Sequence, residues 1–510
     1  MSMTLSQIVG QRFCVGFATP EVPKDFRAFV RKTQIGSVIL FSHNITSAAQ
    51  VRALCEELQA IFLSETGRPG IIMADQEGGT VRRMPADAVL MPGAMALAAG
   101  GQDIRAASRI AGEELAAVGI NMNLAPVADV NSNRLNPVIS VRSYSDDPSR
   151  VGKACTQAIL GLHDAGIYSC TKHFPGHGDT NVDSHLALPL VDKPFEEMEK
   201  VELVPFNAAI RAGTDAIMTT HILFPQLENK KIPATMSRTI MTGLLREKLG
   251  FEGLILSDCM MMNAIKEYYG TVEGCLAAVK AGVDIVLVSH SMDLMLEAWE
   301  RVMQEAEQGR LDMDEMTASA SRVMRYREMA PTFLGDLSRV GTKEHFDAAQ
   351  AMMDSAICRI GGEMPRPTER SLFVAPVPNL AAKVSDALDP SLTFPGAMTK
   401  AFGGEGLLVS IDPTDAEIET AVAKAKDCDA LFLGTVSALR YPGQERLMQA
   451  LMSLEMPTAV ITLRDPYELK LLKKGVCGIA AFAYNQTSLE SVRKVLSGER
   501  IPSGTLPVKL

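Results

Sequence analysis

Titratable side chains are concentrated in one stretch of the chain, TKHFPGHGDTNVDSHLALPLV, at residues 171–191. It holds three of the 8 histidines and two aspartates, namely His173, His177, His185, Asp179 and Asp183. Asp183 stands two residues before His185, so a loop turn could let its carboxylate accept a hydrogen bond from one ring nitrogen. That bond would fix the imidazole tautomer and leave the other nitrogen to exchange protons near neutral pH. The alternative is an Asx-type turn beside a solvated histidine.

A metal site is the rival interpretation of the same stretch. His173 and His177 are spaced i, i+4, and carboxylates lie nearby in the sequence. This spacing serves one metal ion only within a helix, and Pro175 with two glycines argues against a helix there. We therefore favour acid/base chemistry over a metal centre, and we expect no cofactor.

A second stretch, GFEGLILSDCMMMNAI at residues 250–265, contains an apolar strand that ends at Asp258 and continues into a helix-like segment. A carboxylate in that place is positioned like the nucleophile of a retaining glycosidase, which attacks the anomeric carbon. The helix N-terminus beside it would help to keep the carboxylate ionised. Capping this helix is the other role that Asp258 could have, and position alone leaves both open.

Two further stretches are rich in charged and amide groups. Residues 71–84 place Asp75 and Glu77 beside a Gly-Gly turn, and residues 123–148 form a long polar loop that contains Arg142. Planar charged groups that engage two hydroxyls at once suit sugar recognition, so Asp75 and Arg142 are candidate hydroxyl ligands. Long polar loops are more often simply solvated, and without other support that interpretation is preferred.

Eight short apolar runs, rich in β-branched residues, could position these groups. They lie at residues 13–17, 35–41, 71–75, 122–127, 169–174, 216–221, 253–258 and 284–289. Most are followed by a stretch with helical spacing, and eight strands alternating with helices predict a (β/α)8 barrel. Asp75, Lys172 and Asp258 fall at the ends of such runs, and in a barrel these ends converge on one face.

A second α/β unit is predicted after the barrel. Helical patterns from residue 311 onward lead to a Gly/Pro/charged segment at 361–371. Strand-like runs then alternate with helices, at 372–376, 407–411, 430–436, 458–463 and 478–484. We predict a TIM-like barrel over residues 1–335, a helical linker over 336–370 and a smaller α/β sandwich domain over 371–510.

Composition narrows the partners and the compartment. A net charge of −10 and a pI near 5.5 supply no basic field for nucleic acid. The sequence shows neither a signal-peptide pattern nor an apolar run of the roughly 20 residues that a membrane span needs. Its 9 cysteines lack CxxC pairs and are interpreted as reduced core residues. We expect a cytoplasmic protein with no nucleic-acid or membrane partner.

Taken together, these stretches resemble glycoside hydrolase family 3, and specifically its β-N-acetylglucosaminidase branch. The motif KHFPGHGDTxxDSH at residues 172–185 is the distinguishing mark of that branch. Supporting matches are DQEGGxVxR at 75–83, NPVIxxRSY at 136–144, MTTHI at 218–222, PATMS at 233–237 and GLILSD at 253–258. The closing LSGERIPSGTLPV at 496–508 resembles the end of the family's second domain.

The resemblance implies a catalytic aspartate after strand seven, here Asp258. It also implies that a histidine on the strand-five loop is the acid/base, here His185, paired with Asp183. The residues that match sugar-binding or pocket-lining positions are Asp75, Arg142, Lys172, His173 and Met262. Family members with this loop act on peptidoglycan-derived or chitin-derived GlcNAc, so small amino-sugar glycosides are the expected partners.

The sequence departs from the family pattern in two places. Cys259-Met260 stands where an acidic residue and leucine are common, and Ser140-Val141 precedes Arg142 where glycine is frequent. Neither change removes a catalytic group, and both concern the wall of the pocket.

We therefore expect a retaining exo-β-N-acetylglucosaminidase that releases terminal GlcNAc from small cell-wall or chitin-derived glycosides, in keeping with peptidoglycan recycling. A neutral histidine base, unlike a carboxylate, would not repel phosphate, so a β-N-acetylglucosaminide phosphorylase is the main alternative. A metal-dependent hydrolase is less favoured. A sugar-binding protein without turnover is also less favoured, because Asp258 and His185 are both present.

Overall fold

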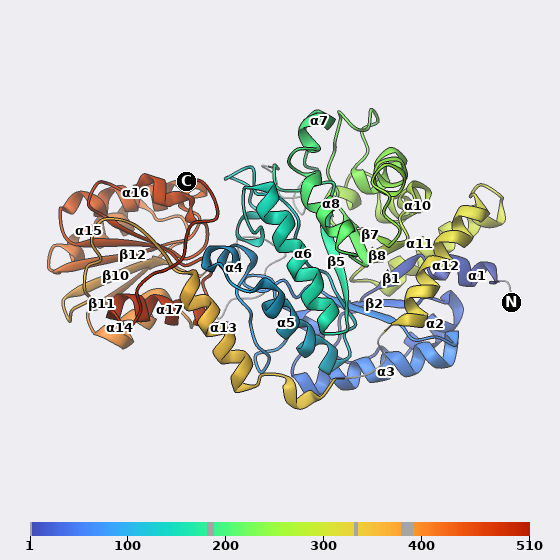
Figure 1. Cartoon of the computed structure of the whole chain (residues 1–510), viewed down its shortest axis with the longest axis horizontal. Coiled ribbons are helices and arrows are strands. Elements are labelled where there is room, and N and C mark those ends of the chain that lie inside the picture. Colours follow the sequence, from blue (N-terminus) through green and yellow to red (C-terminus); the bar gives the residue numbers. More distant parts are fainter. Residues whose placement is uncertain (1–2, 181–187, 331–334, 379–390) are drawn as a thin grey trace.

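The computed structural model describes residues 3–180, 188–330, 335–378 and 391–510. It consists of a closed barrel with surrounding helices and a second, six-stranded sheet with its own helices (Figure 1). The predicted architecture, a TIM-like barrel followed by a smaller α/β unit, is confirmed. None of the helices in these ranges is long and apolar enough to cross a membrane.

Eight parallel strands form the barrel in sequence order, and pairing of the first with the last closes it. The strands are β1 (Phe13–Val15), β2 (Ser37–Leu40), β3 (Ile71–Ala74), β4 (Met122–Asn123), β5 (Tyr168–Phe174), β6 (Ala216–Thr219), β7 (Leu254–Cys259) and β8 (Ile285–Val288). Each overlaps one of the eight predicted runs, and only β5 and β7 extend beyond their run, each by one residue. The barrel was predictable because its strands are buried on both faces and therefore read as continuous apolar runs.

Helices cover the outside of the barrel. Those that follow barrel strands include α2 (Phe26–Thr33), α3 (Ala48–Thr66), α5 (Ile104–Val118), α6 (Pro148–Asp164), α8 (Leu203–Arg211), the π-helical segment η4 (Thr239–Lys248), α10 (Thr271–Ala281) and α11 (Met292–Glu307). Outward side chains such as Ile72 and Ile217 pack under these helices. Inward side chains such as Met73 and Met218 fill the barrel itself, so its interior is a packed core and the open ends of the strands remain for chemistry.

The second sheet has the strand order β11-β10-β12-β13-β14-β9. Its strands are β9 (Cys358–Gly361), β10 (Ser371–Pro376), β11 (Glu405–Val409), β12 (Ala430–Thr435), β13 (Thr458–Thr462) and β14 (Cys477–Ala480). Five of them match predicted runs. The sixth, β9, runs antiparallel to β14 and lies within the segment predicted as a linker. Strand β9 has only four residues, which are too few for an alternating or apolar pattern to mark it as a strand.

One helix joins the two units. Helix α13 (Lys343–Ala356) packs both against α4 (Ala94–Gly100) on the barrel side and against α17 (Gln486–Ser497) beside the second sheet (Figure 1). Thr342 caps its N-terminus by accepting a hydrogen bond from the backbone N–H of His345. The exact domain boundaries stay a prediction.

The core of the second sheet contains an aromatic cluster centred on Phe373 of β10, which is fully buried. Its ring centroid lies 5.0 Å from that of Phe432 and 6.3 Å from those of Phe394 and Phe402. We expect Phe373→Ala to lower the free energy of unfolding of this unit by about 3–5 kcal/mol, because it leaves a cavity that the neighbours cannot fill. Urea unfolding measures this. Leu408→Ala, at a side chain that is 43% exposed on β11, is the control, and equal losses in both variants would contradict the expectation.

Candidate active site

The carboxyl ends of the barrel strands surround a cavity of about 500 Å³, counting the part that is open to solvent. The acidic, basic and imidazole side chains that line it are Asp75, Arg142, Lys172, His173, His177 and Asp258. Five of these six are residues that the sequence predicts for the site, and the structure brings them together from β3, β5, β7 and the loop after β4. This is the face on which barrel enzymes carry their active sites.

Two irregularities in strand pairing occur at this face. The register of β5 against β6 shifts between Lys172 and Phe174, and that of β7 against β8 shifts between Leu256 and Cys259. Such bulges bend a strand locally and redirect its side chains, and they are frequent beside active sites. Lys172, His173 and Asp258 all lie at these shifts.

Lys172 is the buried centre of a cluster of charges. Its ammonium nitrogen lies 2.6 Å from Asp75 Oδ1 and 2.6 Å from Glu77 Oε1, and its side chain is only 1% exposed. Burial alone would lower the pKa of Lys172, but the two carboxylates outweigh burial and raise it. The amine therefore stays charged and is held in one place.

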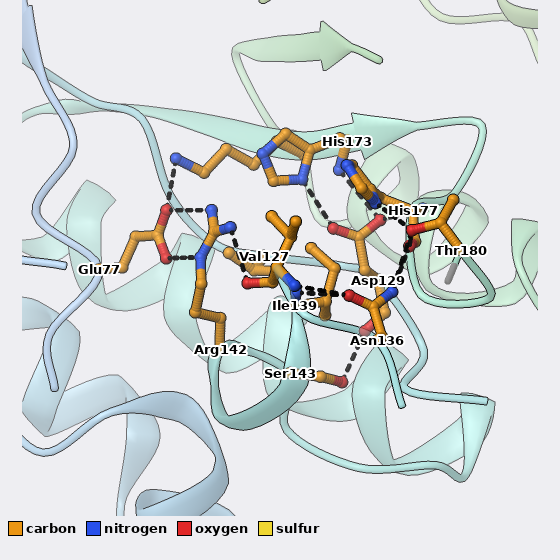
Figure 2. A network of polar contacts seen from close by, with 12 residues as sticks. Glu77, Val127, Asp129, Asn136, Ile139, Arg142, Ser143, His173, His177 and Thr180 are labelled. Carbon is orange, nitrogen blue, oxygen red and sulfur yellow. Dashed lines mark hydrogen bonds and ion pairs between the residues drawn. The ribbon is translucent and has the colours of Figure 1, made fainter. Parts of the chain in front are cut away.

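Arg142 completes the cluster by pairing with Glu77 (Figure 2). It lies in the short 3₁₀ helix η2 (Ser140–Arg142) and forms a bidentate ion pair with Glu77, with Nε and Nη2 each 2.8 Å from a carboxylate oxygen. Burial would raise the pKa of Glu77, but the charges of Arg142 and Lys172 outweigh it and hold that pKa far below its usual value. Glu77 was not singled out from the sequence as a site residue, although its place in the DQEGG motif was a signal.

The Gly78-Gly79 turn fixes the backbone directly after Glu77. Both glycines have positive φ, 88° and 61°, a region that residues with a Cβ rarely adopt. A Cβ on Gly78 would also meet the carbonyl oxygens of Met91 and Pro92 at 2.9 Å. The glycines therefore allow the turn that points the Glu77 carboxylate back toward Arg142 and Lys172.

Asp129 orients the two described histidines of the cavity. Its Oδ2 lies 2.7 Å from His173 Nδ1, and its Oδ1 accepts the backbone N–H of His177 at 2.7 Å (Figure 2). Burial would raise the pKa of Asp129, but His173 and His177 outweigh burial and keep it low. Burial and the neighbouring His173 lower the pKa of His177 to about 4, so its ring is neutral near pH 7.

Asp258 enters the cavity from the end of β7 and is partly exposed. Its Oδ1 accepts the backbone N–H of Cys259 at 2.6 Å. The ring of His221 steadies this strand end, with Nε2 lying 3.0 Å from the Cys259 carbonyl oxygen. Met262 is buried just beyond and is not among the residues that line this cavity, so its contact with a sugar stays a prediction.

The predicted acid/base pair, His185 and Asp183, lies outside the described residues, and its role stays a prediction. Thr180, the last described residue before the pair, is buried beside the cavity. Its hydroxyl oxygen lies 3.0 Å from Nδ1 of His177 and 3.2 Å from Nδ2 of Asn136 (Figure 2). These contacts hold Thr180 next to the histidines of the cavity.

The arrangement of His173 and His177 is not helical. His173 belongs to β5 and His177 follows it in the next turn, and their ring centroids lie 5.7 Å apart in a T-shaped contact. Within residues 3–180, 188–330, 335–378 and 391–510, no group of three or more His, Cys, Asp or Glu side chains is placed so that it could hold a metal ion.

Comparisons with known proteins agree on one family. Residues 4–326 match the family model described as the glycosyl hydrolase family 3 N terminal domain. A solved glycoside hydrolase family 3 β-N-acetylglucosaminidase from Paenibacillus sp. str. FPU-7 aligns with 100% of this chain and 99% of its own, at a TM-score of 0.93 and 34% identity.

Two curated relatives have similar identity over shorter lengths. Beta-hexosaminidase A of Pseudoalteromonas piscicida is 34% identical over 387 residues, which are 67% of this chain and 65% of that protein, just under two thirds of its length. A beta-hexosaminidase of Pseudomonas aeruginosa (strain LESB58) is 35% identical over 283 residues, 54% of this chain and 82% of that protein. With a family model that covers well over half of its length and a barrel of the expected form, the chain belongs to glycosyl hydrolase family 3.

Proposed function

We propose that this chain is a retaining exo-β-N-acetylglucosaminidase that releases terminal GlcNAc from small cell-wall or chitin-derived glycosides. The observation that carries the proposal is that Asp258 lines the same cavity as the buried pair of Asp75 and Lys172. The activity named for the Paenibacillus structure, which aligns over the whole chain, supports the choice of sugar. The hexosaminidases of Pseudoalteromonas and Pseudomonas support it as well.

Two displacements at the anomeric carbon make up the proposed reaction. In the first, Asp258 attacks that carbon while the bond to the leaving oxygen breaks, and His185 as an imidazolium gives this oxygen a proton. In the second, neutral His185 takes a proton from water, and the water oxygen displaces Asp258 to release the sugar with its configuration retained. Asp183 is proposed to fix the tautomer of His185.

The buried charges are proposed to bind the sugar hydroxyls. Lys172, Arg142 and Asp75 can each form charge-assisted hydrogen bonds, which are stronger and more directional than neutral ones. Because the ion pairs already hold these groups in place, little side-chain freedom is lost when a sugar binds. Nδ1 of His173 is hydrogen-bonded to Asp129, and its Nε2 is proposed to bond a sugar hydroxyl. Met262 is proposed as part of the pocket wall.

A cytoplasmic location, and with it a part in recycling cell-wall fragments, belongs to this proposal. Water is the proposed acceptor in the second displacement. Phosphate could take the place of water if the base is a neutral histidine, because no negative charge would then repel it. The sugar product distinguishes hydrolysis from phosphorolysis.

A panel of aryl β-glycosides, assayed with and without phosphate, tests the proposal. We expect the N-acetyl-β-glucosaminide to be cleaved in preference to the β-glucoside, with free GlcNAc as the product in both buffers. Sugar 1-phosphate in place of free GlcNAc would instead identify a phosphorylase. Preference for the glucoside would contradict the proposed substrate. Exhaustive chelation should leave the rate unchanged, whereas a loss that added zinc restores would favour the metal-dependent alternative.

Replacing Asp258 by alanine removes the group proposed to form the glycosyl-enzyme. We expect kcat on the aryl N-acetylglucosaminide to fall by at least ~10³-fold, because the covalent route is closed. Azide should restore part of the rate, since a small anion fits the space that the carboxylate leaves. Asp415→Ala, at an exposed carboxylate on α15 (Asp415–Ala425), is the control and should keep its kcat. Full turnover by Asp258→Ala would end the assignment.

Glu77→Gln keeps the shape of the side chain and removes its charge. We expect the free energy of unfolding to fall by about 3–5 kcal/mol, because Arg142 becomes a buried cation without its carboxylate. The KM for the aryl N-acetylglucosaminide should rise by about tenfold or more as the sugar-binding groups shift. Denaturant unfolding and steady-state kinetics measure the two effects. Glu56→Gln, which breaks the exposed ion pair with Arg52, should cost under ~1 kcal/mol, and a similar cost at Glu77 would refute the expectation.

A further inference from the structure

Several hydrogen bonds join the second unit to the loop after β4, and one of the buried ones reaches η2 itself. The hydroxyl of Ser140, at the start of η2, donates to the carboxylate Oδ1 of Asp465. Asp465 lies three residues after the end of β13 (Thr458–Thr462) and directly before the 3₁₀ helix η8 (Pro466–Leu471) of the second unit. Ser140 is 1% exposed and Asp465 is 5% exposed, so water does not compete for this contact.

Asp465 is itself held firmly within the second unit. Its Oδ2 lies 2.7 Å from Arg440 Nη2 and also accepts the hydroxyl of Ser437. Burial would raise the pKa of Asp465, but Arg440 and Arg464 outweigh it, so the carboxylate stays ionised. A charged acceptor that is fixed by an ion pair makes a strong and well-placed anchor for a hydroxyl.

Ser140 needs such an anchor because of its backbone. Its φ is 43°, in the left-handed region that glycine adopts readily and other residues adopt at a cost of about 1–3 kcal/mol. This chain has serine at that position. The hydrogen bond to Asp465 offsets the strain with an interaction that glycine could not make.

The strained turn leads directly into the sugar-binding cluster. Arg142 is two residues after Ser140, and its backbone N–H donates to the carbonyl of Ile139 at 2.8 Å, within the same turn. The Arg142 side chain then forms the bidentate pair with Glu77, which also holds Lys172 (Figure 2). An unbroken series of direct contacts therefore runs from Asp465 to the floor of the cavity.

We propose that Asp465 is a positioning residue for catalysis: through Ser140 it holds η2 in the conformation that presents Arg142 to the sugar. The inference rests on the proposed function, because Arg142 is taken there to bind a hydroxyl of the substrate. It gives the second unit a part in substrate binding without placing any of its groups on the reacting atoms.

A double-mutant cycle on an aryl N-acetylglucosaminide tests the contact. We expect Asp465→Ala and Ser140→Ala each to raise KM by about tenfold, because a hydrogen bond to a charged group is lost, with kcat changed by less than about twofold. The KM of the double variant should not exceed that of the single variant with the higher KM, since both changes remove the same contact. Asp465→Asn keeps an acceptor oxygen for Ser140 and should recover most of the binding.

Tyr467→Phe is the matched control, because it also removes a buried hydrogen bond between the two units. The Tyr467 hydroxyl accepts from Asn131 Nδ2, and neither residue contacts Ser140 or Arg142 through a hydrogen bond of its side chain. We expect the control to keep the wild-type KM. An equal rise in KM for Tyr467→Phe would show that any loosening of the interface has this effect. A KM for the Asp465→Ala, Ser140→Ala double variant that equals the product of the two single effects would show that the two residues act separately. Either result would overturn the inference.

Hydrogen–deuterium exchange of residues 139–143 gives a readout that does not depend on substrate. The backbone N–H groups of Arg142 and Ser143 are bonded within η2, to Ile139 and Ser140. We expect Asp465→Ala and Ser140→Ala to speed their exchange by about tenfold or more, and Tyr467→Phe to leave it unchanged. If wild-type protein failed to cleave the glycoside but the exchange followed this pattern, the proposed activity would fail and the anchoring would stand. Unchanged exchange in both anchor variants would refute the anchoring itself.

Discussion

A buried positive charge sets the conditions for the whole cavity. The side chain of Lys172 is only 1% exposed, and moving an unpaired charge into such a place costs several kcal/mol. Asp75 and Glu77 supply the opposite charge, and Arg142 balances the second carboxylate. Arg83 also lies 3.4 Å from Asp75, so moving either carboxylate would leave buried cations without a partner. The end of β3, the end of β5 and the helix η2 are therefore locked to one another before any sugar arrives.

Much of the fold could be predicted because burial leaves a clear trace in the sequence. The barrel strands have helices on one side and a filled interior on the other, so each reads as an apolar run, as at residues 253–258. Strand β9 was not predicted, because its residues do not form an apolar run. It is four residues long, it alternates between buried and exposed positions, and it pairs antiparallel at the edge of its sheet. Such a strand is defined by its partner rather than by its own residues.

The sequence predicted those site residues whose type and position at a strand end indicate a chemical role. Asp258 and Lys172 stand at strand ends, and the structure places both at the cavity. Glu77 and Asp129 act through partners that are distant in the sequence, Arg142 for the first and His173 for the second. No local spacing could reveal those pairs. His185 was marked by the motif alone, because neither its type nor its spacing distinguishes it from a solvated loop histidine.

Closure of the barrel has a consequence for how the protein is made. Strand β1 pairs with β8, with Val15 opposite Val288, so the two closing strands leave the ribosome about 270 residues apart. At bacterial or eukaryotic translation rates, that interval lasts roughly 15–55 s. Throughout it, the nascent chain carries sheet edges with unpaired backbone groups, which invite association with other chains. In this enzyme family the sheet edges are therefore exposed during synthesis, and the finished barrel has no free edge.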